Sequence, residues 1–332
     1  MFGTRIGICM GLAALVLGGC GSGGSSSAGG GEEKKLSLAV IPKGTTHEFW
    51  KAVHAGAKKA ADELGVDIIW KGPQKENDLE QQIQVVEDFV AKGVDGIVLA
   101  PLDSKGLVGA VQDAVNGGVP VLIFDSDLDG GDTVSFVATD NFKGGQIAGD
   151  AMAKALGEKG KVVVLRYAEG SASTHQREEG FLDAIKKFPG IEVVSSNQYA
   201  GPTTETAQKA GENLLAPFGK PDGSLSIDGI FCPNESSTFG MLRVLQENGW
   251  AGKVRFYGFD SSDKLIEGLK SGEIHGLVLQ NPFNMGYLAV KTLVAKLRGE
   301  SVEKRIDTGA ALATKENMNE KEIADLLSPP RE

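Results

Sequence analysis

Short apolar segments alternate with amphipathic segments from residue 36 onward, and this rhythm limits the fold more than any other feature of the chain. The first apolar segment, residues 36–41, is a predicted strand that ends at Pro42. Apolar residues at helical spacing follow between Phe49 and Leu64, and Gly65 is a typical helix stop. Further strands are predicted at residues 66–70, 96–99, 119–124, 161–165, 191–195, 227–231, 254–259 and 276–279. Near-continuously apolar strands that alternate with helices favour an α/β fold with parallel sheets covered on both faces.

The alternation runs twice along the chain. A stretch of about fifteen residues rich in Gly and Asp interrupts it after Asp125, and it resumes at Asn141. Helices are predicted at residues 83–92, 105–116, 141–156, 174–187, 204–215, 236–248, 263–270 and 285–297, before a tail of mixed charge. The 332 residues exceed what one hydrophobic core usually supports. The sequence therefore predicts two similar, doubly wound lobes.

The amino-terminal segment has the composition of a secretory leader. Arg5 precedes an uncharged apolar run, residues 6–17, that is too short to span a bilayer. The sequence Leu17-Gly18-Gly19-Cys20 resembles the bacterial lipoprotein box, in which the cysteine becomes the lipidated first residue. We predict a signal peptide at residues 1–19, lipidation such as palmitate at Cys20, and a flexible Gly/Ser tether at residues 20–35. An ordinary signal peptide with an incidental cysteine is the alternative. Lipidation would hold the mature chain at a membrane, in the periplasm or cell envelope.

Charge and cysteine content narrow the class of protein further. The formal net charge is −10 at pH 7, which argues against a nucleic-acid partner because phosphate binding requires clustered Lys and Arg. Cys9 lies in the leader and Cys20 at its end, so Cys232 has no partner for an intramolecular disulfide. Its apolar surroundings predict a buried structural thiol.

Polar side chains follow the predicted strands, where open parallel sheets bind ligands. These positions are residues 43, 46–50, 125–127, 167, 169, 173–177, 234–236, 260–262 and 280–281. They supply aromatic rings for the apolar face of a sugar, carboxylates that accept hydrogen bonds from hydroxyls, and guanidinium and carboxamide donors. A sugar or polyol would satisfy this set. Taken singly, Asp and Asn at strand ends commonly cap the next helix, and His47 and His54 fit a solvated surface better than a metal pair.

Motifs of common enzymes are missing from the sequence. It contains no Gly-Lys-Ser/Thr phosphate loop, no His-Glu-x-x-His and no Gly-x-Ser-x-Gly. The glycines between Gly144 and Gly149 have the wrong spacing for a dinucleotide fingerprint and indicate a hinge or close helix packing. We therefore expect no catalytic residues, no cofactor and no metal. A glycoside hydrolase using Asp125 and Asp260 is a remote alternative.

Seven short sequences, in order and at family spacing, identify a resemblance that covers residues 36–315. They are Phe49-Trp50, Gly118-Val119-Pro120-Val121 before Asp125, Thr139-Asp140-Asn141 with Gly144-Gly145 and Ala148-Gly149, Arg177-Glu178-Glu179-Gly180-Phe181, Asn234-Glu235, Tyr257-Gly258-Phe259-Asp260 and Gln280. The chain resembles the periplasmic sugar-binding proteins of ABC transporters, the ribose/galactose type that shares its fold with LacI-like repressors.

The resemblance implies the type I periplasmic binding protein fold, a clamp of two lobes joined by three hinge strands. The crossings would fall near Thr139, Gln280 and Thr308, giving lobes of residues 36–139 plus 281–308 and 140–280 plus 309–327. By family position, Phe49 and Trp50 would stack on the sugar. Asp125, Arg177, Asn234, Asp260 and Gln280 would hydrogen-bond its hydroxyls. The partners implied are a small sugar and the membrane subunits of an ABC permease, with the protein a monomer.

Three positions depart from the ribose-type pattern. Ser126 stands where arginine is common, His47 where an amide is common, and Pro202 near an expected aromatic. Lys43, after Pro42, is closer to a subgroup that binds rhamnose-like sugars or autoinducer-2, in which this lysine reaches the ligand. We therefore add Lys43, His47 and Ser126 to the predicted ligand-binding residues, and the sugar stays open. A sensing protein that presents its ligand to a membrane receptor is the alternative function.

Overall fold

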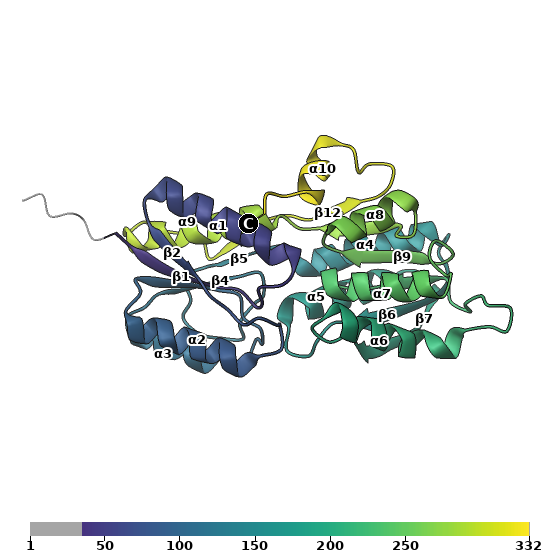
Figure 1. Cartoon of the computed structure of the whole chain (residues 1–332), viewed down its shortest axis with the longest axis horizontal. Helices are drawn as coiled ribbons and strands as arrows, with labels where there is room; N and C mark the ends of the chain where they lie inside the picture. The colour runs from purple at the N-terminus through teal and green to yellow at the C-terminus, as the bar shows by residue number, and fades with distance from the viewer. Residues whose placement is uncertain (1–34, 332) are drawn as a thin grey trace, which may run out of the picture. The chain divides into compact units, whose positions relative to one another are not determined.

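Two six-stranded sheets organise residues 35–331, the part of the chain that the computed structural model describes (Figure 1). The first sheet has the order β11-β5-β4-β3-β1-β2, and the second has the order β12-β10-β9-β8-β6-β7. The first consists of β1 (Ser37–Ile41), β2 (Asp67–Trp70), β3 (Gly96–Leu99), β4 (Val121–Phe124), β5 (Phe136–Ala138) and β11 (Arg305–Asp307). The second consists of β6 (Lys159–Arg166), β7 (Gly190–Tyr199), β8 (Gly229–Phe231), β9 (Arg255–Phe259), β10 (Gly276–Leu279) and β12 (Ala311–Ala313). The two orders are equivalent, with β1 matching β6 and β4 matching β9, which confirms the predicted pair of similar α/β lobes.

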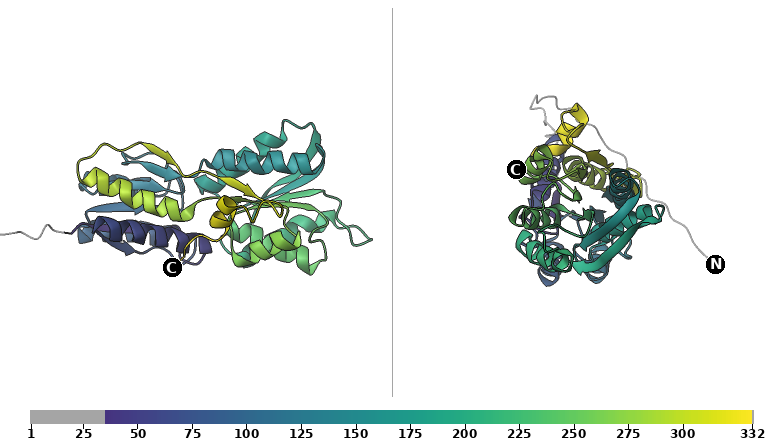
Figure 2. Two further views of the ribbon diagram at one scale, coloured as in Figure 1. Left: turned by 90° about the horizontal axis from the view of Figure 1, so that it is seen from above. Right: turned by 90° about the vertical axis from the view of Figure 1, so that its right-hand side faces the viewer.

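Helices cover both faces of each sheet (Figure 2). In the first lobe, α1 (Glu48–Leu64) and α9 (Pro282–Leu297) share one face, and α2 (Leu79–Lys92) and α3 (Val108–Asn116) share the other. In the second lobe, α4 (Asn141–Ala155) and α5 (Ala172–Ile185) lie together opposite α6 (Thr204–Leu215), α7 (Glu235–Glu247), α8 (Asp263–Ser271) and α10 (Lys321–Leu327). Because the central strands are buried on both faces, their sequences are continuously apolar rather than alternating.

The chain passes between the two sheets three times. It leaves the first sheet after β5 to enter α4, returns after β10 to enter α9, and crosses again between β11 and β12. β11 joins β5 in parallel, whereas β12 runs antiparallel to β10. Short edge strands thus complete both sheets from the same crossing segment.

Close packing of α4 against α5 fixes the backbone beside the predicted site. A Cβ atom added to Gly145 would overlap the carbonyl oxygen of Arg177, and one added to Gly180 would overlap that of Phe142. The glycines that follow Asn141 therefore serve helix packing, one of the two roles predicted for them. The buried thiol of Cys232 is confirmed as a free cysteine with no exposed surface.

Several element boundaries differ from the predictions for local reasons. α3 begins at Val108 rather than residue 105, because the Asp103 carboxylate accepts the backbone N–H groups of Lys105 and Gly106 and holds a turn there. α9 begins at Pro282, with the Asn281 side chain capping it. β7 extends to Tyr199, and β5, β11, β12 and α10 were not predicted. The predicted signal peptide, Cys20 and most of the tether lie outside the described residues.

None of the helices within residues 35–331 is both long enough and apolar enough to cross a membrane.

Candidate functional site

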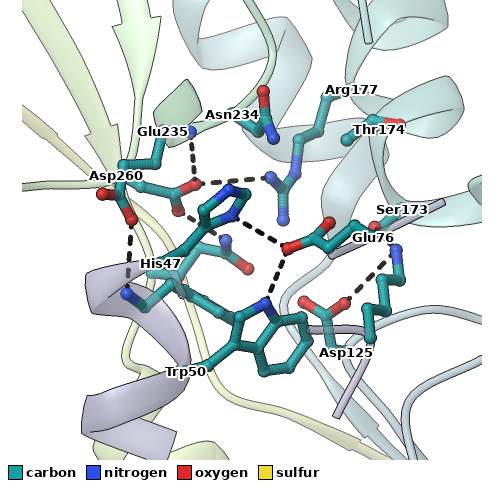
Figure 3. Close-up of a pocket in the computed structure, with 13 residues that line it drawn as sticks. His47, Trp50, Glu76, Asp125, Ser173, Thr174, Arg177, Asn234, Glu235 and Asp260 are labelled. Carbon is teal, nitrogen blue, oxygen red and sulfur yellow. Dashed lines mark hydrogen bonds and ion pairs between the residues drawn. The ribbon is translucent and has the colours of Figure 1, made fainter. Parts of the chain in front are cut away.

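The carboxyl ends of strands from both sheets face one small cavity of about 30 Å³ (Figure 3). Lys43 lies two residues beyond β1, Asp125 follows β4, Asp260 follows β9 and Gln280 follows β10. The residues that line the cavity are Lys43, His47, Phe49, Trp50, Glu76, Asp125, Ser173, Thr174, Arg177, Asn234, Glu235, Asp260 and Gln280. The cavity is thus placed where parallel sheets bind ligands, and both lobes supply its walls.

Two aspartates occupy equivalent positions in the two lobes. Asp125 and Asp260 each follow a Phe and precede a Ser, directly after β4 and β9. Their backbones are left-handed, with φ of 61° and 67°, a conformation that Asp tolerates better than most residues. Burial raises the pKa of both carboxyls, and nearby Lys43 and Arg177 oppose that shift. At these equivalent positions, each lobe therefore has a buried carboxylate with a cation beside it.

Arg177 is held by its own lobe. Its Nε–H donates to Asn141 Oδ1 at 2.8 Å, and its Nη1 donates to the Pro233 carbonyl oxygen at 3.0 Å. The guanidinium lies 4.2 Å from the centroid of the Phe259 ring and 3.9 Å from the Asp260 carboxylate. Since all four partners belong to the second lobe, the guanidinium keeps its position without help from the first.

Two amide side chains complete the second-lobe wall. Asn234 caps α7, where its Oδ1 accepts the Ser237 N–H at 3.2 Å, so helix capping and cavity lining both apply to this residue. Gln280 Nε2 donates to Asp260 Oδ1 at 2.7 Å. Gln280 Oε1 is buried and has no hydrogen-bond partner within residues 35–331. A buried acceptor of this kind usually finds a donor, and a ligand hydroxyl can supply one.

Lys43 reaches from the first lobe to the second. Its Nζ lies 3.6 Å from the Asp125 carboxylate and donates to the hydroxyls of Ser171 and Ser173 at 3.1 Å each. The lysine is only 3% exposed. Its ammonium group is therefore fixed by one partner in its own lobe and two in the other.

His47 and Glu76 form a buried ion pair, with His47 Nδ1 2.9 Å from Glu76 Oε1. Burial lowers the pKa of His47, but Glu76 outweighs that effect and brings the pKa to about 9. Burial raises the pKa of Glu76, but His47, Lys43 and Trp50 outweigh it and bring the pKa to about 2. His47 is thus a charged wall of the cavity, and its interpretation as a solvated surface residue is wrong.

The two aromatic residues differ in their surroundings. Phe49 and Trp50 meet edge to face with centroids 4.9 Å apart, and Trp50 is only 3% exposed and packs in the first-lobe core. The Trp50 indole Nε1–H donates to Glu76 Oε1 at 2.6 Å. The Phe49 backbone N–H donates to Glu235 Oε2 of the second lobe at 3.3 Å. Burial raises the pKa of Glu235 to about 7.

Nine of the ten predicted ligand-binding residues line the cavity, and Ser126 does not. Ser126 is fully buried behind the wall, where its Oγ accepts the Ser173 backbone N–H at 3.1 Å. Because Asp125 occupies the cavity-facing position at the end of β4, the next side chain turns away from it. The prediction that Ser126 faces a ligand is therefore wrong.

Four lining residues were not among those predicted to bind ligand: Glu76, Ser173, Thr174 and Glu235. The last three belong to the strand-end positions from which the site was assembled, so position alone pointed to them. Glu76 gave no such signal, because it lies six residues beyond the end of β2 in a polar connection. Within residues 35–331, no group of three or more His, Cys, Asp or Glu side chains could hold a metal ion.

The fold and this cavity define a class of protein, and comparison with known families identifies it. The periplasmic binding protein domain matches residues 38–301, so the chain belongs to that family. The resemblance found in the sequence is thereby confirmed, and the family implies an extracytoplasmic location.

The relatives are sugar-binding proteins. The chain is 32% identical over 272 residues to the ribose import binding protein RbsB of Haemophilus influenzae, covering 81% of this chain and 88% of that one. It is 30% identical to the D-allose-binding periplasmic protein of Escherichia coli, covering 77% and 83%. The crystal structure of a carbohydrate transporter solute binding protein from Agrobacterium radiobacter, in complex with D-arabinose, matches with a TM-score of 0.84 and 38% identity, covering 89% and 100%. The chain is therefore a binding protein and not an enzyme.

Proposed function

We propose that this protein captures one neutral monosaccharide between its lobes and delivers it to an ABC importer. The observation that carries the proposal is the pairing of charge in the cavity. Lys43 with Asp125, His47 with Glu76, and Arg177 with Asp260 place every one of these cations within 4 Å of a carboxylate, at 3.6, 2.9 and 3.9 Å. A ligand phosphate or carboxylate would have to compete for those cations. A ligand hydroxyl can instead donate to the carboxylates and accept from the cations without separating the pairs.

The walls of the cavity support a sugar. Phe49 and Trp50 offer apolar surface to the C–H face of a sugar ring, and Gln280 Oε1 offers an acceptor for a hydroxyl. Relatives named for ribose and D-allose, and solved structures with D-arabinose, D-fucose and D-tagatopyranose, indicate which sugars to test first.

Capture depends on closure of the two lobes. A ligand that contacts both lobes in the closed state stabilises that state by the difference between its affinities for the closed and open states. We propose that the three connections at residues 139–140, 280–281 and 308–310 are the hinges, dividing the chain into lobes of residues 36–139 plus 281–308 and 140–280 plus 309–327. The closed form would be the one recognised by the permease.

A thermal-shift screen tests the proposed ligand class. The panel holds D-ribose, D-arabinose, D-allose, D-fucose, L-rhamnose, xylitol and autoinducer-2, with D-ribose 5-phosphate and D-galacturonate as anionic controls. A ligand at about 100 times its Kd adds roughly 2.7 kcal/mol to the free energy of unfolding, which a melting curve resolves. We expect at least one neutral sugar to raise Tm and neither anion to do so. Stabilisation by an anion alone would overturn the proposal.

We further propose that lipid on Cys20 anchors the protein at the membrane. The apolar leader, the small residues before Cys20 and the Gly/Ser segment after it support this anchor. Cys20→Ser should move the protein from the membrane fraction to the soluble fraction while leaving sugar binding unchanged. A Cys20→Ser protein that stays in the membrane fraction would contradict lipidation at this residue.

A further inference from the structure

Glu76 gathers hydrogen bonds from both lobes on one buried carboxylate. Its Oε1 receives the Trp50 indole N–H and the His47 ring at 2.6 and 2.9 Å, both from the first lobe (Figure 3). Its Oε2 accepts the Tyr167 hydroxyl at 2.7 Å, and Tyr167 belongs to the second lobe. Glu76 is 8% exposed and Tyr167 is 1% exposed. Three donors use most of the capacity of one carboxylate, so Glu76 acts mainly on its neighbours rather than on a ligand.

Each end of this contact is fixed to its own lobe. The Tyr167 backbone N–H donates to Glu178 at 2.9 Å, and its carbonyl oxygen accepts the Gly201 N–H at 3.0 Å. Both partners lie in the second lobe. On the other side, the Glu76 side chain passes the backbone of Gly44, where an added Cβ would lie 2.9 Å from Glu76 Cγ. Separation of the lobes would therefore break the Tyr167–Glu76 contact and leave the bonds to His47 and Trp50 in place.

Loss of the Tyr167–Glu76 hydrogen bond should destabilise the closed state and leave the open state nearly unchanged. In the closed state the Glu76 carboxylate is removed from water, and loss of one donor leaves part of it unsatisfied. In an open state water can replace the Tyr167 hydroxyl at little cost. A contact that is made only on closure changes the rate at which the closed state opens, because that opening must break it.

We propose that Glu76 is a positioning residue that orients His47 and Trp50 in the sugar cavity and that, through Tyr167, locks the closed state and sets how long a bound sugar stays. This role rests on the proposed sugar-binding function. The connection after β2, which carries Glu76, thus contributes to binding. Tyr167 contributes through Glu76, because it does not itself line the cavity.

The test compares Tyr167→Phe with a matched control, Tyr287→Phe. Tyr287 also donates to a glutamate at 2.7 Å, Glu63, but α9 and α1 place both residues in the first lobe and the contact is exposed. Association and dissociation rates are measured by stopped-flow tryptophan fluorescence with the sugar that gives the largest thermal shift. Tyr167→Phe should raise koff roughly 10- to 100-fold and change kon less than about 3-fold, the effect of one hydrogen bond to a charged group. Tyr287→Phe should change neither rate.

A double-mutant cycle separates the proposed coupling from a general loss of stability. In a Glu76→Gln background, the effect of Tyr167→Phe on koff should shrink several-fold because the shared carboxylate is gone. Equal koff values for Tyr167→Phe and Tyr287→Phe, or an undiminished effect in the Glu76→Gln background, would overturn the inference alone. A wild-type protein that binds no sugar of the panel would overturn the proposed function, and this inference with it.

Discussion

The two lobes hold their halves of the cavity in different ways. In the second lobe, Arg177 and Asp260 are fixed by partners of the same lobe, namely Asn141, the Pro233 carbonyl, Phe259 and Gln280. In the first lobe, Lys43 and Glu76 have partners in their own lobe but also bond to Ser171, Ser173 and Tyr167 across the cleft. The second lobe therefore presents a preformed surface, and the first lobe completes its half only when the lobes meet.

The equivalent aspartates make this difference sharper. Asp125 and Asp260 share the same left-handed backbone at matching strand ends, yet the cation beside the first is an ammonium and beside the second a guanidinium. A guanidinium is a planar fork of donors that keeps one orientation, whereas an ammonium is a compact charge on a flexible stem. We expect a sugar to engage the second lobe first and the first lobe on closure.

The largest effect on binding should come from Arg177→Ala. It removes the cation beside the Asp260 carboxylate, which keeps donors from Gln280 and the Glu235 backbone, and it takes from Asn141 Oδ1 and the Pro233 carbonyl the donors that Arg177 supplies in a buried site. These losses should weaken sugar binding by about 3 kcal/mol. Isothermal titration calorimetry measures this change. Arg243→Ala is the control, because Arg243 lies in an exposed pair with Glu247 and should leave the affinity unchanged. An Arg177→Ala protein that binds the sugar with wild-type affinity would contradict the claim that this part of the second lobe holds the ligand.

His47→Gln should reveal the pH range of the His47–Glu76 pair. The folded-state pKa of His47 is about 9 against an ordinary 6.5, so its contribution is complete below pH 6.5 and is lost as pH rises through 9. The folded-state pKa of Glu76 is about 2 against an ordinary 4.5, so its contribution is present above pH 4.5 and is lost as pH falls toward 2. The free energy of unfolding should therefore differ between wild type and His47→Gln by about 2 kcal/mol more at pH 5.5 than at pH 9.5.

Urea unfolding at the two pH values measures this difference. Glu235 and Asp260 also face His47, whose charge lowers the pKa of both carboxyls, so the measured difference contains their interaction with His47 as well as that of Glu76. A difference that does not change between pH 5.5 and pH 9.5 would show that the pair does not contribute as a charged pair.

Lys43→Met should weaken binding less than Arg177→Ala does, by about 1–2 kcal/mol. Only Asp125 loses a charged partner, and because burial already raises its pKa, it can take up a proton when the ammonium is absent. Calorimetry with the same sugar compares the two variants directly. A loss equal to or larger than that of Arg177→Ala would break the proposed asymmetry between the lobes.

The smallest effect should come from Arg331→Ala. Arg331 also joins the lobes, with Nη1 3.3 Å from Glu48 of the first lobe and 3.4 Å from Asp263 of the second. The side chain of Asp263 is 87% exposed, so this bridge is screened by water and should change affinity by no more than about 0.5 kcal/mol. A koff increase as large as that expected for Tyr167→Phe would show that the exposed tail, rather than the buried contact, controls opening.

The helices and strands that periodicity predicted correctly are those that depend on local sequence patterns rather than on contacts between distant residues. Buried parallel strands and amphipathic helices are local patterns, which is why β3, β10 and α6 fall where periodicity placed them. β5, β11 and β12 are three residues each, too short for a period to be recognised, and they exist because neighbouring strands pair with them. Position after a strand and family resemblance together located most of the cavity.

Two site residues show where that reasoning stops. Ser126 follows Asp125 directly, and sequence order does not reveal that the left-handed turn at Asp125 sends the next side chain behind the wall. Glu76 lies six residues beyond the end of β2, and its place in the cavity depends on Gly44, Trp50 and Tyr167. All three of these residues are far from Glu76 in the sequence. Contacts of this kind are set by tertiary structure and leave no local pattern.

Isothermal titration calorimetry of the wild-type protein and Arg177→Ala with D-ribose, D-arabinose, D-allose and D-fucose tests the central claim most directly. The account predicts that at least one of these sugars binds the wild type with one site per chain, and that Arg177→Ala weakens that binding at least about 100-fold, the equivalent of roughly 3 kcal/mol. Absence of binding by all four, or equal binding by the two proteins, would contradict capture of a neutral sugar in the cavity between Asp125 and Asp260.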